Sequence, residues 1–518
     1  MTQSASDADR QTQSSLGDPI VLTLSIGFIV LFLALSFYDL DLVADSISQG
    51  FAWSALTFGT YFQFLMLLTF FIAIGLALSP AGNAKIGNLD APELSTFKWL
   101  SIILCTLLGG GGVFFAAGEP IYHFVNVPPA FDTDPSVAAA VPGALAQSFT
   151  HWGFVGWAIL GSLTAIVLAH AHYVKGQPLQ PRTLLYPLFG ERLMRGPLGG
   201  VVDTCCVLAV VAGTVGPVGF LATQVSHGLE VLFGLPNTFV TRLLVLATLG
   251  MVYVLSAVSG VHKGMQLLSR FNVMLALGIG AVIFLFGPTL FLFDSYFAGM
   301  GTYLDDFFKM VTMTAETAPA DWMQWWIVFF YAWFIAFAPL MAIFVARISR
   351  GRTIREMILA VAVIAPIATT VWFTLLGGSG IYYQLTGVVD LTDALTNFQF
   401  DIATLALAQA LPGGTWMALA ILLLTTIFVA TTGDSMSYSI AMVGAGHDEP
   451  SPFLRAFWGV IMTIMAAVLL AMREGQIAAL QQFIVITAVP VSLILLPSLW
   501  DGPKAAFAMA REQGLIDS

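Results

Sequence analysis

Apolar residues occur along the chain in long runs that short polar segments separate. About twelve runs approach the roughly 20 residues that a helix needs to cross a bilayer. They lie near residues 20–38, 57–79, 99–116, 147–171, 203–224, 239–259, 269–293, 326–346, 356–378, 415–432, 455–472 and 479–499. The pattern predicts an all-α polytopic membrane protein with twelve transmembrane helices.

Composition supports a membrane protein. Of the 518 residues, 58% are hydrophobic and 9% are charged, and a soluble fold could not bury that much apolar surface. The first twenty residues are polar and lack an apolar core, which predicts a disordered tail rather than a cleavable signal peptide. The three cysteines, Cys105, Cys205 and Cys206, all lie inside predicted spans, so we expect them to pack rather than to form disulfides or bind metal.

The placement of charge predicts the orientation in the membrane. Lys and Arg concentrate on the cytoplasmic side of membrane proteins. With the N-terminus inside, only Arg242, Lys309 and Arg473 fall outside, and an even number of spans puts both termini in the cytoplasm. The net charge of −11 comes largely from outer loops and the N-terminus, and no basic stripe suggests a nucleic-acid partner.

Two predicted spans contain sequence that disturbs a regular helix. Gly109 to Gly112 leave about one turn without side chains, which suits either close helix packing or an unwound stretch that gives room and carbonyls to a ligand. In the segment 428–435, Thr431 and Thr432 could supply oxygen ligands to a hard monovalent cation, or could bond back to carbonyls one turn earlier. Asp434 adds an ionisable group, which is costly at membrane depth.

A third polar site is His151, beside Trp152 and Trp157 in one predicted span. A lone intramembrane histidine is more often a hydrogen-bonded packing residue than a proton relay. Glu119, next to Pro120 at the end of the third span, is expected to cap or pair locally.

Aromatic residues crowd the segment 324–339, which reads QWWIVFFYAWFIAFAP. Residues at helical spacing share one face: Trp326, Phe330, Trp333, Phe334 and Phe337. Such a ribbon usually packs against lipid or other helices. It can also bind a quaternary ammonium group through the ring faces, at about 0.5–2 kcal/mol per contact.

Five strings occur in order along the chain: GEPIYHF, HWGFVGWA, LLYPLFGERLMRGPLGGVVD, ARISRGRTIRE at 346–356 and the TTGDS segment. With these strings, of which ARISRGRTIRE is the most characteristic, the chain resembles the betaine/choline/carnitine transporter family (BCCT) over about residues 20–500.

The resemblance implies a leucine-transporter-like core of two inverted five-helix repeats, spans 3–7 and 8–12, preceded by two peripheral helices. The corresponding boundaries are a tail at 1–19, peripheral helices at 20–80, repeats at 98–293 and 324–500, an interfacial segment at 294–323 and a cytoplasmic tail at 501–518. It also implies a homotrimer, with 298–314 as a candidate interfacial helix, in the cytoplasmic (inner) membrane of a bacterium.

The family's aromatic box corresponds to Trp152, Trp157, Trp333, Phe334 and Phe337, and Gly109 and Gly111 are expected to line the same site. Phenyl rings stand where the family usually has larger ring systems, and Leu160 replaces a tyrosine typical of betaine carriers. The substrate therefore stays open among glycine betaine, choline, carnitine, ectoine and dimethylsulfoniopropionate.

The resemblance also suggests a coupling ion. In sodium-coupled relatives, a site between spans 3 and 10 corresponds to Thr431 and Thr432 with carbonyls around Cys105, Leu108 and Phe428. Thr214 fits one residue of a second site, although Val218 follows one turn later. We therefore expect sodium as coupling ion and no other cofactor.

Together these observations predict a secondary active importer of a methylated onium compound. Proton coupling, an uncoupled or antiporting carrier, a channel and a substrate-binding sensor remain as alternatives. An enzyme is not expected, because His151, Glu119 and Asp434 are scattered along the sequence.

Overall fold

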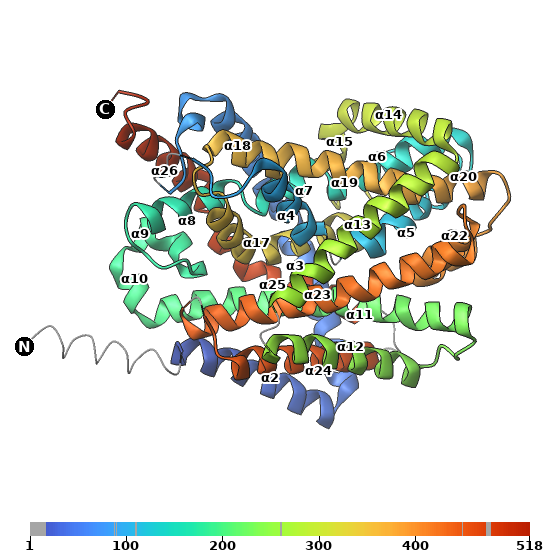
Figure 1. Cartoon of the computed structure of the whole chain (residues 1–518), viewed down its shortest axis with the longest axis horizontal. Helices are drawn as coiled ribbons and strands as arrows, with labels where there is room; N and C mark the ends of the chain where they lie inside the picture. The colour runs from blue at the N-terminus through green and yellow to red at the C-terminus, as the bar shows by residue number, and fades with distance from the viewer. Residues whose placement is uncertain are drawn as a thin grey trace, which may run out of the picture.

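The computed structural model describes residues 17–87, 89, 91–108, 111–259, 262–447, 449–472 and 478–517, without the side chains of 105–108, 259 and 262–266. Helices dominate these residues, and an isolated bridge between Lys85 and Thr353 is the one β-pairing among them (Figure 1). The prediction of an all-helical protein is therefore confirmed for the part of the chain that the structure describes.

Within the described residues, eleven helical stretches are long and apolar enough to cross a membrane. They are Pro19–Tyr38, Leu40–Leu78, Ala138–Val174, Pro197–Phe233, Phe239–Val258, Leu267–Phe286, Ala320–Ile348, Ile354–Leu385, Thr415–Ala445, Pro452–Ala471 and Ala478–Leu495. The third predicted span, 99–116, coincides with two shorter helices, α4 (Thr96–Leu108) and α5 (Gly111–Val125). Gly109 and Gly110, which separate them, lie outside the described residues.

Two helices extend well beyond their predicted apolar runs. One of them is α3 (Leu40–Leu78), which begins in a polar stretch. The Asp39 side chain caps its start by accepting a hydrogen bond from the Leu42 N–H. The other, α23 (Thr415–Ala445), continues through the TTGDS segment. Its hydroxyls form bonds inside the helix, as when Ser437 donates to the Gly433 carbonyl at 2.6 Å, so polar residues do not end it.

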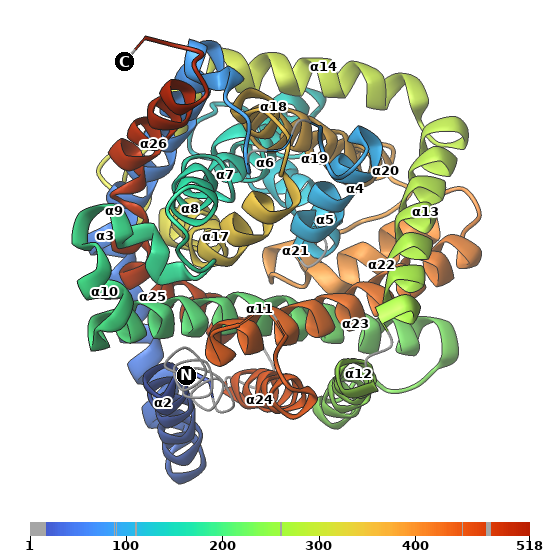
Figure 2. The ribbon, with the colours of Figure 1, turned by 60° about the vertical axis from the view of Figure 1, so that its left-hand side comes forward.

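The centre of the molecule is built from long helices that pack on one another. The helix α11 (Pro197–Phe233) contacts α23, α25 (Ala478–Leu495) and α17 (Phe329–Ile348). The helices α2 (Pro19–Tyr38), α12 (Phe239–Ser259) and α24 (Pro452–Ala471) lie along one edge in both views (Figures 1 and 2). The core therefore lies around α11 and α17.

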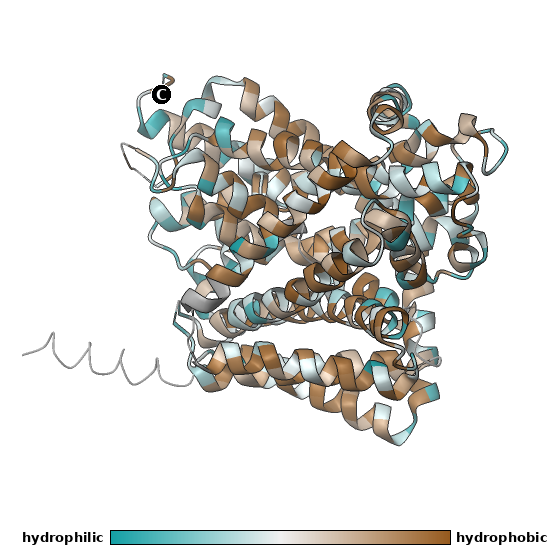
Figure 3. Cartoon of the chain, turned by 45° about the vertical axis from the view of Figure 1, so that its right-hand side comes forward, coloured by the Kyte–Doolittle hydropathy of each residue, from teal (hydrophilic) through white to brown (hydrophobic). Residues whose placement is uncertain are grey.

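Apolar side chains also cover the outside of the molecule. Leu31 of α2, Leu244 of α12 and Leu277 of α13 (His262–Phe286) are each about three-fifths exposed. Hydrophobic residues colour the outer faces of these helices (Figure 3). A water-soluble surface would not carry so much exposed apolar area, so these faces fit a lipid environment.

The segment expected to lie along the membrane at 298–314 is helical for most of its length. It covers the end of α14 (Thr289–Asp305) and all of α15 (Phe307–Val311), and residues 312–314 follow α15 without helical structure. The helix α14 packs on α6 (Val141–Trp152), where a Cβ on Gly299 would approach the Leu145 side chain to 2.8 Å.

The remaining elements form parts of the spans 138–174, 320–348 and 354–385, connect the spans, or, in the case of α26, follow the last span. They are η1 (Pro80–Asn83), η2 (Ala138–Ala140), α7 (Phe154–Ile159), α8 (Leu163–Tyr173), η3 (Pro181–Leu185), α9 (Tyr186–Phe189), α10 (Glu191–Arg195), α16 (Ala320–Met323), η4 (Gln324–Val328), α18 (Ile354–Leu359), η5 (Ala360–Ile364), α19 (Ala365–Phe373), η6 (Thr374–Gly378), α20 (Ser379–Leu385), α21 (Thr392–Thr396), α22 (Phe400–Ala410) and α26 (Ser498–Glu512).

Candidate functional site: an aromatic cavity between helices

A break in the span 138–174 places Trp152 at the centre of the molecule. The helix α6 ends at Trp152, Gly153 has a non-helical backbone with φ −96° and ψ −145°, and α7 starts at Phe154. A Cβ on Gly153 would lie 2.2 Å from the Phe149 carbonyl oxygen, so a larger residue would not fit this backbone. The break turns the chain so that Trp152 from α6 and Leu160 from the end of α7 face one cavity.

The opposite wall comes from α17, which follows a π-helical turn at η4. Trp333, Phe334, Phe337 and Met341 line the cavity from this helix. Their spacing is close to the helical repeat, so they share one face. Four residues of the sequence-predicted ribbon are buried and Phe337 is partly buried, although Trp326 and Phe330 lie beyond the cavity.

The cavity has an empty volume of about 520 Å³, part of which is open to the outside. Its lining residues are Gly111, Trp152, Leu160, Pro217, Trp333, Phe334, Phe337, Met341, Thr432 and Met436. Among the described residues, this lining holds four aromatic side chains, one hydroxyl and no charged side chain. The rings are edge to face: Trp152 lies 5.9 Å from Trp333 and 5.7 Å from Phe334 between ring centroids.

Gly111 allows the two indoles to approach each other. A Cβ on Gly111 would lie 2.2 Å from Cη2 of Trp333 and 2.8 Å from Cη2 of Trp152. Any side chain larger than hydrogen would push at least one ring away. Gly111, one position of the glycine run, therefore leaves the room that the two indole rings occupy at the cavity.

A proline in α11 orients the Trp333 ring. Pro217 has no backbone N–H, so it leaves the carbonyl of Gly213, one turn earlier, without its usual helical donor. The indole Nε1 of Trp333 donates to this carbonyl at 3.1 Å. A Cβ on Gly213 would also lie 2.7 Å from Cε2 of Phe337. One turn of α11 thus fixes two rings of the cavity wall.

The structure brings together most of the predicted substrate-binding residues, but not all. Trp152, Trp333, Phe334, Phe337 and Gly111 line the cavity. Trp157 is buried in α7, and it is absent from the lining. Gly109 lies outside the described residues.

The residues predicted to hold sodium are only partly described. The Thr431 hydroxyl donates to the carbonyl of Ile427 at 2.9 Å and approaches that of Phe428 at 3.2 Å, which is the local bonding that the sequence left as an alternative. Thr432 lines the cavity. The side chains of Cys105 and Leu108, at the end of α4, lie outside the described residues.

The threonine of the second predicted sodium site is fully buried in α11. The Thr214 hydroxyl donates to the Val210 carbonyl at 2.7 Å, and Thr214 is not a lining residue of the cavity.

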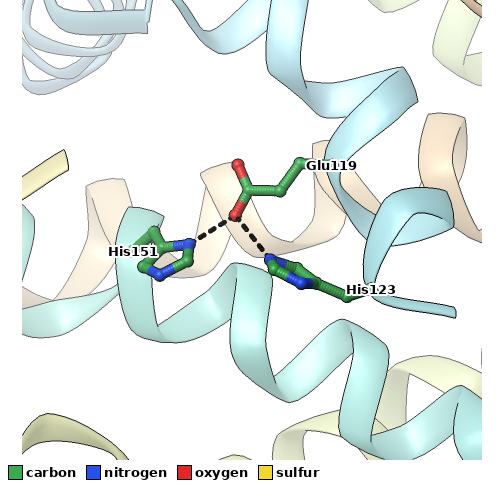
Figure 4. A group of neighbouring side chains, drawn as sticks. All are labelled: Glu119, His123 and His151. Atoms are coloured by element: carbon green, nitrogen blue, oxygen red, sulfur yellow. Dashed lines mark hydrogen bonds and ion pairs between the residues drawn. The ribbon is translucent and has the colours of Figure 1, made fainter. Parts of the chain in front are cut away.

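Glu119 is not a local cap, because it contacts the next span. It lies on α5 and is fully buried. Its Oε1 is 2.6 Å from Nδ1 of His151, and its Oε2 accepts from Nε1 of Trp152 at 2.8 Å (Figure 4 shows the first contact). His123, one turn further along α5, points to the same carboxylate, with Nε2 3.8 Å from Oε1. Glu119, His123 and His151 therefore meet beside the Trp152 ring of the cavity.

Sequence reasoning missed four contributors to the site, namely Met341, Met436, Pro217 and the Gly213 carbonyl. Met341 and Met436 have no signal among many apolar residues. The Gly213 carbonyl did have a signal in the sequence, namely Pro217, because a proline inside a helix leaves the carbonyl four residues earlier without its backbone donor. The bond between Glu119 and Trp152 joins different helices and could not be deduced from spacing.

Comparison with known proteins agrees with this architecture. A sequence model described as the BCCT, betaine/carnitine/choline family transporter matches residues 20–511. Glycine betaine transporter 2 of Vibrio parahaemolyticus is 47% identical over 96% of this chain and 91% of its own length. The glycine betaine transporter OpuD of Bacillus subtilis is 32% identical over 85% of each chain. The high-affinity choline transport protein of Escherichia coli is 30% identical over 92% of this chain and 70% of its own length.

Proposed function

Because the chain belongs to the betaine/carnitine/choline transporter family, a family of multi-pass membrane transporters, we propose that it imports a methylated onium zwitterion or cation by alternating access. The observation that carries the proposal is the cavity wall of Trp152, Trp333, Phe334 and Phe337, in whose lining the structure describes no charged side chain. A quaternary ammonium or sulfonium group cannot donate hydrogen bonds, so ring faces can replace its hydration shell where a carboxylate is absent.

The substrate class follows from the same wall. Candidate substrates are glycine betaine, choline, carnitine, ectoine and dimethylsulfoniopropionate. Phenyl faces bind cations more weakly than indole faces, and two of the four aromatic side chains are phenylalanines. The affinity of the cavity for each compound therefore has to be measured. We propose that Gly109 and Gly111 also lie against the substrate. Trp157 is buried and outside the described lining, and we propose that it joins the aromatic box when substrate is bound.

Direct binding tests this proposal. Purified protein is titrated with each candidate, and uptake is followed in proteoliposomes. Trp152→Ala or Trp333→Ala should weaken binding about 2–30-fold, the equivalent of the ~0.5–2 kcal/mol of one cation–π contact. Trp416→Ala is the matched control, because this ring is 79% exposed and far from the lining. Unimpaired binding in both cavity variants would refute the aromatic box.

We further propose sodium as the coupling ion. The oxygen-rich stretch of α23 supports this, since Thr431 and Thr432 sit beside the cavity with the Phe428 carbonyl, and Cys105 and Leu108 would complete the site from α4. Thr214 would belong to a weaker second site. Proton coupling, antiport and substrate sensing without transport are the alternatives.

Replacing sodium with potassium tests the coupling. Uptake should fall steeply without sodium, and Thr431→Ala and Thr432→Ala should raise the sodium concentration needed for half-maximal uptake. Thr426→Ala on the same helix is the control, because its hydroxyl bonds locally to the Leu422 carbonyl at 2.8 Å and it is not a lining residue. Equal uptake in potassium would rule out sodium symport.

We also propose the family's wider architecture for this chain. It comprises twelve spans, two inverted five-helix repeats at 98–293 and 324–500, two peripheral helices at 20–80, and both termini in the cytoplasm of a bacterium. The chain would assemble as a homotrimer in the inner membrane, with 298–314 near the interface.

A further inference from the structure

A cluster of three titratable residues lies outside the cavity lining: Glu119, His123 and His151. Their ligand-type atoms all lie within 4.8 Å of one another, and all three residues are fully buried. Glu119 and His123 come from α5 and His151 from α6, and the three side chains converge (Figure 4).

The charge of Glu119 has no fixed counter-charge nearby. A buried carboxylate costs several kcal/mol unless it is paired. In the described part of the chain, the ion pairs that reach Glu119 come from His151 and His123, and neither carries a permanent charge. Within the cluster, positive charge can therefore be gained only as a proton on His151 or His123.

Other titratable groups near the cluster do not alter this conclusion. Tyr122 on α5 lies against His123, at 5.5 Å between ring centroids, and Asp321 on α16 lies beyond Tyr122. On the other helices packed against α5, Lys98 and Asp393 are exposed and Asp401 is half-buried. Among the described ion pairs, none joins these groups to Glu119.

The bonds of His151 show how the cluster could hold a further proton. Gln147 Nε2 is 3.1 Å from Nε2 of His151, so the amide donates and the ring accepts there. The ring proton then lies on Nδ1, from which it is donated to Glu119. The Gln147 Oε1 has no partner, and a half-turn of the amide would let it accept from a protonated Nε2.

His123 is a second proton acceptor in the same place. Neither of its ring nitrogens has a hydrogen-bond partner, although the ring is fully buried and its Nε2 faces Glu119. Buried polar groups usually have partners, so an unpartnered imidazole beside a carboxylate suits a site whose proton count changes.

The cluster reaches the cavity through a single bond. Trp152 donates its indole N–H to Oε2 of Glu119 and presents its ring to the cavity. A hydrogen bond to an ionised acceptor is roughly twice as strong as one to a neutral acceptor, and it polarises the donor. A charged Glu119 therefore holds the ring firmly and makes its face more attractive to a cation.

We propose that Glu119, together with His151 and His123, is a proton-linked positioning residue that sets the affinity of the cavity for a cation through Trp152. This inference rests on the proposed onium-binding function. Adding a proton to the cluster weakens cation binding, and by linkage cation binding releases a proton. The affinity for an onium compound therefore falls as the pH falls through the titration of the cluster.

The first test is the pH dependence of binding. Glycine betaine and choline are titrated into the purified full chain between about pH 5 and pH 9, and the wild type should bind about fivefold more weakly at the acid end, the lower end of typical coupling. Glu119→Gln, which keeps the shape, should bind with the same affinity at every pH. Trp152→Phe keeps a ring without the N–H and should lose the pH dependence as well.

Glu230→Gln is the matched control. Glu230 also pairs with a histidine, at 3.0 Å from His227, but it is exposed at the end of α11 and should leave the profile unchanged. A pH-independent wild type, or a Glu119→Gln or Trp152→Phe variant with the wild-type slope, would overturn the proposal. Calorimetry of the wild type in buffers of different ionisation enthalpy measures proton release without any variant, and absence of release at every pH would overturn it too.

A ligand-free measurement separates this inference from the proposed function. With ¹⁵N-labelled tryptophan, the Trp152 indole resonance, assigned by its loss in Trp152→Phe, should shift with pH in the wild type but not in Glu119→Gln. If no onium compound binds, the proposed function fails while this shift still supports the cluster as the proton site that controls Trp152. If binding occurs but the resonance does not shift, the cluster proposal is wrong and the function stands.

Discussion

At the scale of single residues, the cavity depends on glycines beside the aromatic rings as much as on the rings themselves. Gly111 and Gly213 lie where a Cβ would come within 2.7 Å or less of a cavity ring. Real Cβ atoms do not approach other atoms so closely, so these positions admit only glycine unless a ring moves. The aromatic wall and its glycines therefore form one unit.

Gly111→Ala tests this dependence. The added methyl group should displace Trp333 or Trp152 and weaken onium binding by about 1–3 kcal/mol, the usual cost of overpacking. Isothermal titration with the best ligand measures the change. Gly75→Ala is the control, since nothing lies within 4 Å of a Cβ at that position of α3. Wild-type affinity in Gly111→Ala would show that the rings can move aside for a methyl group without loss of binding.

At the scale of elements, breaks in helices put polar backbone groups where side chains need them. Pro217 frees the Gly213 carbonyl for Trp333, and Gly153 turns the chain after Trp152. The string ARISRGRTIRE at 346–356 also uses a backbone carbonyl at a helix end. Its Arg355 donates from Nε to the Ala77 carbonyl at 2.6 Å, where α3 ends. Each irregularity thus joins two helices.

Pro217→Ala should weaken the orientation of Trp333. Alanine restores a backbone N–H that competes for the Gly213 carbonyl, so the indole loses part of a hydrogen bond worth about 0.5–1.5 kcal/mol. We expect onium affinity to fall about 2–10-fold, with no loss of thermal stability because the helix gains a bond. Pro503→Ala in α26, outside the cavity, should leave affinity unchanged. A Pro217→Ala protein with unaltered affinity would contradict the role given to this carbonyl.

At the scale of the whole molecule, one buried arginine ties three distant segments together. Arg182 on η3 donates to Asp203 on α11 from Nε at 2.7 Å, and its other nitrogens reach Asp18 at the start of α2 and the Met194 carbonyl. Burial alone lowers the pKa of a guanidinium, but Asp203 and Asp18 raise the pKa of Arg182 above its ordinary value. The peripheral helix α2 is thereby anchored to the core.

Arg182→Gln should destabilise the fold, because it leaves Asp203 buried without its partner, and breaking a buried pair costs about 3–5 kcal/mol. Thermal unfolding in detergent should therefore occur at a clearly lower temperature. Arg195→Gln removes an ion pair whose arginine side chain is 83% exposed and should change the unfolding temperature little. Equal unfolding temperatures for the two variants would show that the network is not a structural anchor.

The sequence by itself determined the class of protein and the face of α17 that forms the cavity wall. Long apolar runs and the spacing of Trp333, Phe334 and Phe337 are local properties, and helices in lipid must satisfy their own backbone bonds, so local pattern suffices. It also indicated Trp152 and Gly111, through a motif and a glycine run. It placed the end of the tenth predicted span too early, because hydropathy does not detect hydroxyls that bond within their own helix.

Only the tertiary structure decided which side chains meet. Glu119 and His151 are 32 residues apart, and Trp333 and Gly213 are 120 apart. Such contacts depend on how α5, α6, α11 and α17 pack, which no periodicity encodes. The packing also left Trp157 outside the cavity lining and placed Thr432 within it. Spacing along a helix fixes the face on which a residue lies, but the neighbouring helices fix what that face touches.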